Sequence, residues 1–278
     1  MKMQSDYKYL LQNMGVMEEI PSIQYLRDLQ TAWTFYQPFH NIDLLADFLQ
    51  KKPPLDREQS WERCLKGLGG PCHVQSSSFL FLLEQLGFDA HFCSGHINHE
   101  GDHLLVCVQV EGKSFICDVG NGHPYLYPFP ILGEHHQVHL GWEIRSKGDG
   151  TTLSLEQKTP FRKTWKKVFT ATTKKCAWND FSEGIHRHHT EIGFGPFLTG
   201  LRAIRLGQNS AIILRDDSFM ICEDSIWKTT TIINSHSHIL SEIFRLKELH
   251  INDALKSWFI NTDRLSSANN IQLLPENN

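Results

Sequence analysis

The stretch Gly67–Ser76, which reads Gly-Leu-Gly-Gly-Pro-Cys-His-Val-Gln-Ser, decides how this chain is organised. Gly69 and Gly70 allow backbone angles and close chain approaches that a side chain would block. Pro71 cannot continue a helix, but its fixed φ angle suits the opening of one. We therefore predict that Cys72 lies in the first turn of a helix, where the helix dipole favours a thiolate. The alternative is a small apolar residue at a turn, since buried inert cysteines are common.

The residues on either side of this stretch predict further helices. Apolar residues recur at helical spacing after the cysteine, and Gly87 is a suitable C-terminal stop. Upstream, a short helical segment breaks near Gly15, and Pro21 opens another. Residues 37–43 read as a loop. The apolar positions on which these helices depend are Leu10, Leu11, Leu26, Leu29, Trp33, Phe79, Leu82, Leu83 and Leu86.

From about residue 89 the pattern changes to strands. Two runs rich in β-branched and apolar residues, His103–Val110 and Lys113–Val119, are separated by only two residues, one of them glycine. A two-residue hairpin loop places His103 opposite Gly120 and diagonal to Asp118, on one face of the sheet. An imidazole oriented by a carboxylate is what a cysteine nucleophile needs as its base. The spacing therefore predicts a Cys72, His103, Asp118 constellation.

The second half of the chain predicts a mixture of short strands and helices. A short helix is expected from Phe181 to about His188, capped by Asn179 or Asp180. Apolar faces around Phe244 and Trp258 indicate closing helices, and a frayed end is expected from Pro275 to Asn278. The further predicted strands are Trp142–Arg145, Thr152–Gln157, Trp165–Thr170, Ala211–Leu214, Phe219–Cys222 and Trp227–Ile233.

The composition is that of an ordinary globular protein. The chain has 278 residues, of which 40% are hydrophobic and 21% are charged, and its formal net charge of -4 gives no reason to expect a nucleic-acid partner. No apolar run approaches the length that crosses a membrane, and the start resembles no signal peptide. Seven scattered cysteines form neither a disulfide framework nor a zinc motif, so a reducing cytoplasm is expected.

Sixteen histidines raise the question of a metal site. Two groups are candidates, one around His135-His136 and His139 and the other at His186 and His188-His189. Their spacing matches no tight metal-site template, and no acidic or cysteine partner stands at ligand spacing beside them. We therefore expect no metal ion.

Three motifs in this order resemble those of the arylamine N-acetyltransferase family. They are Gly69-Gly70-Pro71-Cys72, then His103-Leu104-Leu105-Val106 in a strand, then Asp118-Val119-Gly120-Asn121-Gly122. Residues 38–43, Pro-Phe-His-Asn-Ile-Asp, look like the family's Pro-Phe-Glu-Asn-Leu-Asp segment. Residues 180–197 are similar to the stretch that joins its second and third domains. The resemblance covers most of the chain, with the specific matches between residues 38 and 122.

The resemblance implies an α+β fold with a cysteine-protease-like core. Residues 1–88 would form an N-terminal helical bundle with the nucleophile Cys72, residues 89–195 a central β-barrel with His103 and Asp118, and residues 196–278 a C-terminal α/β lid. The implied reaction is ping-pong acyl transfer from acetyl-CoA to a small-molecule amine. Cys72 would take the acetyl group, His103 would hold the thiol proton, and Asp118 would orient the imidazole. A thioester exchange needs a good thiolate nucleophile and little else.

The surroundings of Cys72 depart from the family pattern Arg-Gly-Gly-aromatic-Cys-aromatic-Glu-x-Asn. The replacements are Leu68 for Arg, Pro71 and His73 for the aromatics, Val74 for Glu and Ser76 for Asn, and Asn121 stands where Gly-x-Gly usually holds an aromatic residue. The joint loss of Arg and Glu is expected if the two were paired, because neither charge is then left without a partner. Fewer aromatic walls predict a more polar acceptor than a plain aniline.

Other residues near the site have two interpretations each. Gly120 and Gly122 leave backbone amides that could contact a pyrophosphate or acyl oxygen, or they form a tight turn. His73 is either a second base or an exposed helix residue, and we favour exposure. A basic run between residues 162 and 175 is either a coenzyme A phosphate site or, as we favour, a solvated surface. This basic run consists of Arg162, Lys163, Lys166, Lys167, Lys174 and Lys175.

Two other classes of function remain open. A thiol hydrolase of the papain or transglutaminase type uses Cys, His and Asp in the same order, and differs in passing the acyl group to water. A non-catalytic binding module would keep the fold without an activated cysteine. The donor could also be another acyl-CoA or a carrier-protein thioester, in an amide-forming transacylase.

Overall fold

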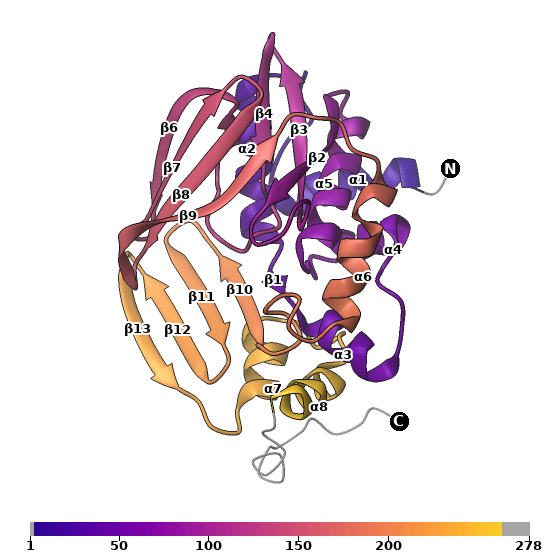
Figure 1. Cartoon of the computed structure of the whole chain (residues 1–278), viewed down its shortest axis with the longest axis vertical. Coiled ribbons are helices and arrows are strands. Elements are labelled where there is room, and N and C mark those ends of the chain that lie inside the picture. The colour runs from indigo at the N-terminus through magenta and orange to yellow at the C-terminus, as the bar shows by residue number, and fades with distance from the viewer. Residues whose placement is uncertain (1–2, 263–278) are drawn as a thin grey trace.

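The N-terminal part of the protein is mostly helical, as predicted, and holds five helices. Figure 1 shows the computed structural model, which describes residues 3–262. The helices are α1 (Met3–Met14), α2 (Ile23–Tyr36), α3 (Ile42–Gln50), α4 (Arg57–Leu65) and α5 (Cys72–Gln85). The predicted apolar positions of α1, α2 and α5 form one buried cluster, in which Leu26, Trp33 and Phe79 are fully enclosed. The amphipathic pattern alone therefore located this core.

An antiparallel sheet of eight strands follows and curls into a nearly closed barrel (Figure 1). Its strand order is β5-β4-β3-β2-β9-β8-β7-β6. The two ends of the order, β5 and β6, are joined by Ile131, whose amide donates to the carbonyl of Ser114 in β4 at 3.0 Å and whose carbonyl accepts the amide of Gly150, just after β7, at 2.9 Å. The strands are β2 (Asp89–His96), β3 (His103–Val110), β4 (Lys113–Cys117), β5 (Phe129–Pro130), β6 (Leu132–His139), β7 (Trp142–Asp149), β8 (Thr152–Thr159) and β9 (Arg162–Thr172).

A second, smaller sheet lies below the barrel in Figure 1. Its order is β1-β10-β11-β12-β13, so that the short strand β1 (Phe39–His40) from the N-terminal part completes a sheet built by the C-terminal part. The other strands are β10 (Arg202–Leu206), β11 (Ser210–Arg215), β12 (Ser218–Glu223) and β13 (Ile226–Thr231). Helix α3 packs against α8 (Ile251–Asn261), and both belong to a buried apolar cluster with the π turn Ile239–Ile243. This turn follows the short helix α7 (His236–His238), which also contacts α8.

Several local predictions were wrong in ways that have a physical reason. The predicted loop at residues 37–43 contains β1 and the start of α3, because Phe39 and His40 pair with β10, far away in the sequence. Strands β2, β5, β6 and β10 were not among the strands predicted by range. The helix near residue 181 is α6 (Ser182–Thr190), and it is preceded by a 3₁₀ turn, Trp178–Phe181. The side chain of Asp180 accepts the Ala177 amide at 2.7 Å and so closes that turn instead of capping α6.

The remaining expectations about the chain concern its boundaries. The three domain ranges stay a proposal, and β1 shows that the sheet of the third range borrows a strand from the first. The residues from Pro275 to Asn278, expected to fray, lie outside the described residues. Between residues 3 and 262 there is no helix long and apolar enough to cross a bilayer.

Candidate active site

The turn before Cys72 requires glycine at two positions. Gly69 has φ +61° and Gly70 has φ +143°, a region that L side chains rarely adopt. A Cβ atom on Gly69 would lie 1.9 Å from the carbonyl oxygen of Pro38, so no side chain fits there. Pro71 is the residue before the first turn of α5, and Cys72 is the first residue of that helix. The predicted position of Cys72 at a helix N-terminus is confirmed.

Buried glutamines hold this turn in place, and the sequence reasoning missed them. Gln75, in the second turn of α5, donates from Nε2 to the carbonyl of Gly70 at 2.7 Å and to that of Pro38 at 3.3 Å. Its Oε1 accepts the indole N–H of Trp33 at 3.2 Å. Gln37 accepts the amide of Gly69 at 3.0 Å. The only sign of this role in the sequence was that Gln75 is an uncharged polar residue on the buried face of a predicted helix.

His103 and Asp118 meet as the hairpin register predicted. Strands β3 and β4 pair from Val110 with Lys113 to Val106 with Cys117. The ladder ends one residue before Asp118. Its Oδ2 lies 2.9 Å from Nε2 of His103, and both side chains are almost fully buried. The predicted hydrogen bond across this hairpin is therefore present.

The environment of His103 favours a protonated ring. Burial alone lowers the pKa of His103, but the charge of Asp118, its hydrogen bond, and a hydrogen bond with the side chain of Cys72 together outweigh burial. The pKa of His103 is consequently raised well above its usual value. Cys72 is partly exposed, whereas the other two residues are enclosed. The three side chains thus form one hydrogen-bonded series, and its cysteine end is partly exposed to solvent.

Two packing contacts fix the relative positions of the helix and the hairpin. Ser76 of α5, which replaces the family's Asn, donates from Oγ to the carbonyl of Leu104 at 2.8 Å, next to His103 in β3. Gly95 of β2 lies opposite His103 in the sheet, and a Cβ atom on it would lie 3.2 Å from Cβ of His103. A larger residue at position 95 would therefore press on the imidazole.

Gly120 and Gly122 are explained by close packing. A Cβ atom on Gly120 would lie 2.4 Å from Cα of Cys72, so the loop after Asp118 rests directly on Cys72. Gly122 has φ +81°, and a Cβ atom there would lie 2.8 Å from the ring of Phe39. The amide of Gly120 donates to Oδ1 of Asp118 at 3.2 Å and is thus not free, which favours the tight-turn interpretation for this glycine.

Asn121, between these glycines, begins a polar network that runs into the barrel. Its Oδ1 lies 2.5 Å from Nδ1 of His123. Tyr125 donates to Oε1 of Gln157 at 3.0 Å, and Tyr125 Oη and Gln157 Nε2 both lie 3.5 Å from Nδ1 of His123. Burial lowers the pKa of His123 to about 4, so the ring is neutral at physiological pH. The network ties one end of the Asn121 amide to His123.

Of two expectations about the departures from the family, one stays a prediction and one needs correction. Leu68 and Val74 lie in different apolar clusters of this chain, and the pairing of the family's Arg and Glu at these positions stays a prediction. Position 68 instead meets position 40, where Nε2 of His40 donates to the carbonyl of Leu68 at 2.7 Å. His73, expected to be exposed, is only 4% exposed, because α6 covers it with His189. Helix spacing could not reveal a cover supplied by a helix more than a hundred residues later.

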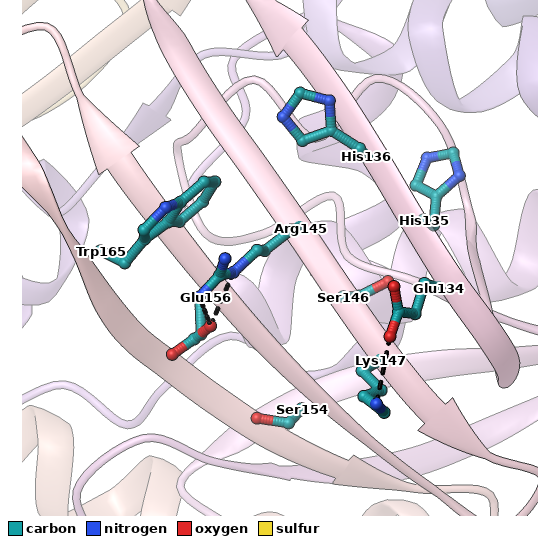
Figure 2. A pocket seen from close by; sticks show the side chains of 9 residues that line it. All are labelled: Glu134, His135, His136, Arg145, Ser146, Lys147, Ser154, Glu156 and Trp165. Atoms are coloured by element: carbon teal, nitrogen blue, oxygen red, sulfur yellow. Dashed lines mark hydrogen bonds and ion pairs between the residues drawn. The ribbon is translucent and has the colours of Figure 1, made fainter.

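The other predicted groups lie away from Cys72. No group of three or more potential metal ligands is arranged to hold an ion within the described part of the chain. All six residues of the basic run are exposed, with four of them on β9. A hollow of about 620 Å³ lies over β6 to β9. Figure 2 shows the side chains that line it, Arg145, Glu156 and Trp165 among them. None of the three proposed catalytic residues lines it.

Comparison with known protein families gives a broad match. The model of a family described as N-acetyltransferase matches residues 22–253. Arylamine N-acetyltransferase / N-hydroxyarylamine O-acetyltransferase from Salmonella typhimurium is 29% identical over 146 residues, which is 49% of this chain and 51% of that protein. Proansamycin X synthase from Amycolatopsis mediterranei is 26% identical over 126 residues, which is 42% of this chain and 48% of that protein. These alignments span about half the length of the curated relatives.

Solved structures match over nearly the whole fold. Arylamine N-acetyltransferase from Salmonella typhimurium superposes with a TM-score of 0.80 at 20% identity, covering 92% of this chain and 98% of that one. The Mycobacterium marinum arylamine N-acetyltransferase in complex with CoA gives a TM-score of 0.76 at 19% identity, covering 93% and 99%. At such identities the likeness is one of fold, and it confirms the predicted α+β class.

Proposed function

The chain belongs to the arylamine N-acetyltransferase family, and from that premise we propose that it transfers an acetyl group from acetyl-CoA to an amine through a thioester on Cys72. One observation carries the proposal. The His103–Asp118 hydrogen bond of 2.9 Å stands beside a partly exposed cysteine at the start of a helix. This is the arrangement that a thiolate nucleophile with an oriented base requires.

In the first half-reaction Cys72 is acetylated. His103 holds the proton of the Cys72 thiol, so that sulfur attacks the acetyl-CoA carbonyl as a thiolate. The tetrahedral intermediate collapses when the C–S bond to coenzyme A breaks, and the departing thiolate takes the proton from the His103 imidazolium. Asp118 stabilises the charged ring and fixes which nitrogen faces the sulfur. The products are free coenzyme A and an acetyl-cysteine thioester.

In the second half-reaction an amine displaces Cys72. The amine nitrogen attacks the thioester carbonyl and loses its proton to His103. The bond between carbon and Sγ of Cys72 then breaks, and the sulfur recovers its proton. Both half-reactions exchange acyl groups without redox change, and thioester exchange of this kind requires no metal ion.

We place the binding site of the acyl donor on the exposed side of Cys72, next to the loop after Asp118. Since the Gly120 amide donates to Asp118, contact with the acyl or phosphate oxygens falls to Gly122 within this loop. A neighbour of the same fold was solved in complex with CoA, which supports a coenzyme A thioester. Proansamycin X synthase is named for a product and not for acetyl transfer, so other acyl-CoA and carrier thioesters belong among the donors to be tested.

The acceptor is proposed to be a polar amine. Asn121 lies between two glycines that pack on Cys72 and on Phe39, and its amide is tied to His123 at one end. Its other end supplies a hydrogen-bonding group where an aromatic ring would offer only a flat apolar surface. Hydrazides and amines that carry a neighbouring oxygen satisfy such a group, whereas plain anilines leave it unpaired.

The reaction is assigned to a reducing cytoplasm. All seven cysteines are free, including Cys72, and a nucleophilic thiol must stay reduced to act.

Release of the coenzyme A thiol, followed with and without an amine, separates transferase from hydrolase. A transferase releases about one equivalent of coenzyme A in a burst and continues only when a hydrazide or polar amine is added. Steady release in the absence of any amine, at a rate that added amine leaves unchanged, would identify a thiol hydrolase. Absence of both burst and turnover with acetyl-CoA would exclude this donor and turn attention to other thioesters.

A further inference from the structure

Two buried histidines outside the proposed catalytic series meet beside the nucleophile. His73 is the second residue of α5 and follows Cys72 directly, and His189 lies near the C-terminal end of α6. Their ring centroids are 5.2 Å apart at an interplanar angle of 68°, an edge-to-face contact. The side chains are 4% and 3% exposed. This contact is where α6 touches the first turn of the nucleophile helix.

The ring nitrogens of this pair are enclosed without polar partners. Nε2 of His73 and both nitrogens of His189 are buried, and none has a hydrogen-bond partner among residues 3–262. A neutral imidazole tolerates such a site, since its edge rests on the face of the other ring. An imidazolium there would be a desolvated charge without a partner, which is far more costly.

The charged and titratable neighbours do not supply that partner. His188, and for His189 also His186, face the pair from α6 itself. Asp43 of α3 is the acidic group whose charge reaches His189, and it is already bonded to Arg63 of α4. Burial is the main cause that lowers the pKa of both rings, to about 4 for His189.

We propose that His73 and His189 are positioning residues that hold the first turn of α5 against α6 while both rings are neutral, and release it when either is protonated. Cys72 is the residue that this release displaces, because it precedes His73 in the same helical turn. The effect on catalysis rests on the proposed function of Cys72, whereas the contact itself can be followed without any acyl transfer.

The sign of the pH effect follows from the lowered pKa. We call the state in which α6 packs on the first turn of α5 the closed state, and the state in which it is released the open state. A histidine whose pKa is about 6.5 in the open state and about 4 in the closed state stabilises the closed state above pH 6.5. That stability is lost as the pH falls from 6.5 towards 4. Between pH 7.5 and pH 5, His189 alone should lower the ratio of closed to open α6 by about 30-fold.

Amide hydrogen exchange of α6, read by mass spectrometry at pH 7.5 and pH 5 and corrected for intrinsic exchange rates, tests this directly. Protection of residues 182–190 should fall by about 30-fold in the unaltered protein. It should be nearly independent of pH in the double variant His73→Phe, His189→Phe, which keeps two packed rings but removes their titration. His186→Gln, an exposed change in the same helix, should behave like the unaltered protein.

The acylation rate of Cys72 by acetyl-CoA supplies the second readout. Relative to its own rate at pH 7.5, the double variant should keep several-fold more activity at pH 5 than the unaltered protein. If the double variant does not fold by circular dichroism, His189→Gln alone replaces it. Equal pH dependence of α6 protection in the variant and the unaltered protein overturns the proposal. Failure of Cys72 to become acylated at any pH would instead refute the proposed function. The hydrogen-exchange result would then still test the contact between His73 and His189.

Discussion

Placing a single methyl group on Gly120 should disable the protein without unfolding it. In the structure this Cβ atom would lie 2.4 Å from Cα and 2.9 Å from Cβ of Cys72, whereas ordinary contacts begin near 3.4 Å. Either the loop or Cys72 must therefore move by about 1 Å. A misplacement of that size at a reacting atom costs about 100-fold in rate, or about 2.7 kcal/mol of activation free energy. Overpacking of this kind costs about 1–3 kcal/mol of stability.

The assay compares Gly120→Ala with a matched glycine elsewhere. Gly184 lies within α6, and a Cβ atom on it would meet nothing within 4 Å. Gly184→Ala should therefore leave acyl transfer unchanged and raise stability by about 0.5–1 kcal/mol. Rates of acetyl-CoA-dependent acylation and urea midpoints are measured for both variants. A Gly120→Ala protein that is folded and acylates within threefold of the unaltered rate would refute the close packing of this loop on Cys72.

Three further changes test other parts of the site. Asp118→Asn should lower kcat/KM by up to about 10⁴-fold and slow the reaction of Cys72 with iodoacetamide at neutral pH, since the His103 ring loses its charged partner. An unchanged alkylation rate would mean that Cys72, His103 and Asp118 do not act as one unit. Gln75→Leu should lower the free energy of unfolding by about 2–4 kcal/mol in urea melts, because the Trp33 indole and backbone carbonyls lose a buried partner. A loss under 1 kcal/mol would show that these groups find other hydrogen-bond partners. Asn121→Phe should shift preference from polar hydrazides towards anilines by 10-fold or more, and equal kcat/KM ratios in both proteins would remove Asn121 from the acceptor site.

The geometry around Cys72, His103 and Asp118 could be predicted because its determinants are local in the sequence. The turn before Cys72 depends on adjacent glycines and a proline. The meeting of His103 with Asp118 depends on the register of one short hairpin, which a two-residue loop fixes. In each case the residues that decide the geometry lie within about fifteen positions of one another.

What could not be predicted depends on contacts between distant segments. Strand β1 has only two residues, and it is a strand only because β10 pairs with it. His73 is buried because α6 returns over α5, which no periodicity near position 73 records. Gln75 reads as an ordinary polar helix residue until the carbonyls that it satisfies are known. Each of these is set by tertiary packing, which overrides local propensity.

The central claim is that Cys72 carries the acyl group, and intact-mass analysis tests it most directly. The protein is incubated with acetyl-CoA without an amine, weighed, digested and mapped, with Cys72→Ala as the control. We expect one added acetyl group, located on Cys72, absent from Cys72→Ala, and discharged when a polar amine or hydrazide is added. An acetyl adduct that persists in a folded Cys72→Ala protein, or none on Cys72 with any thioester donor, would contradict the account.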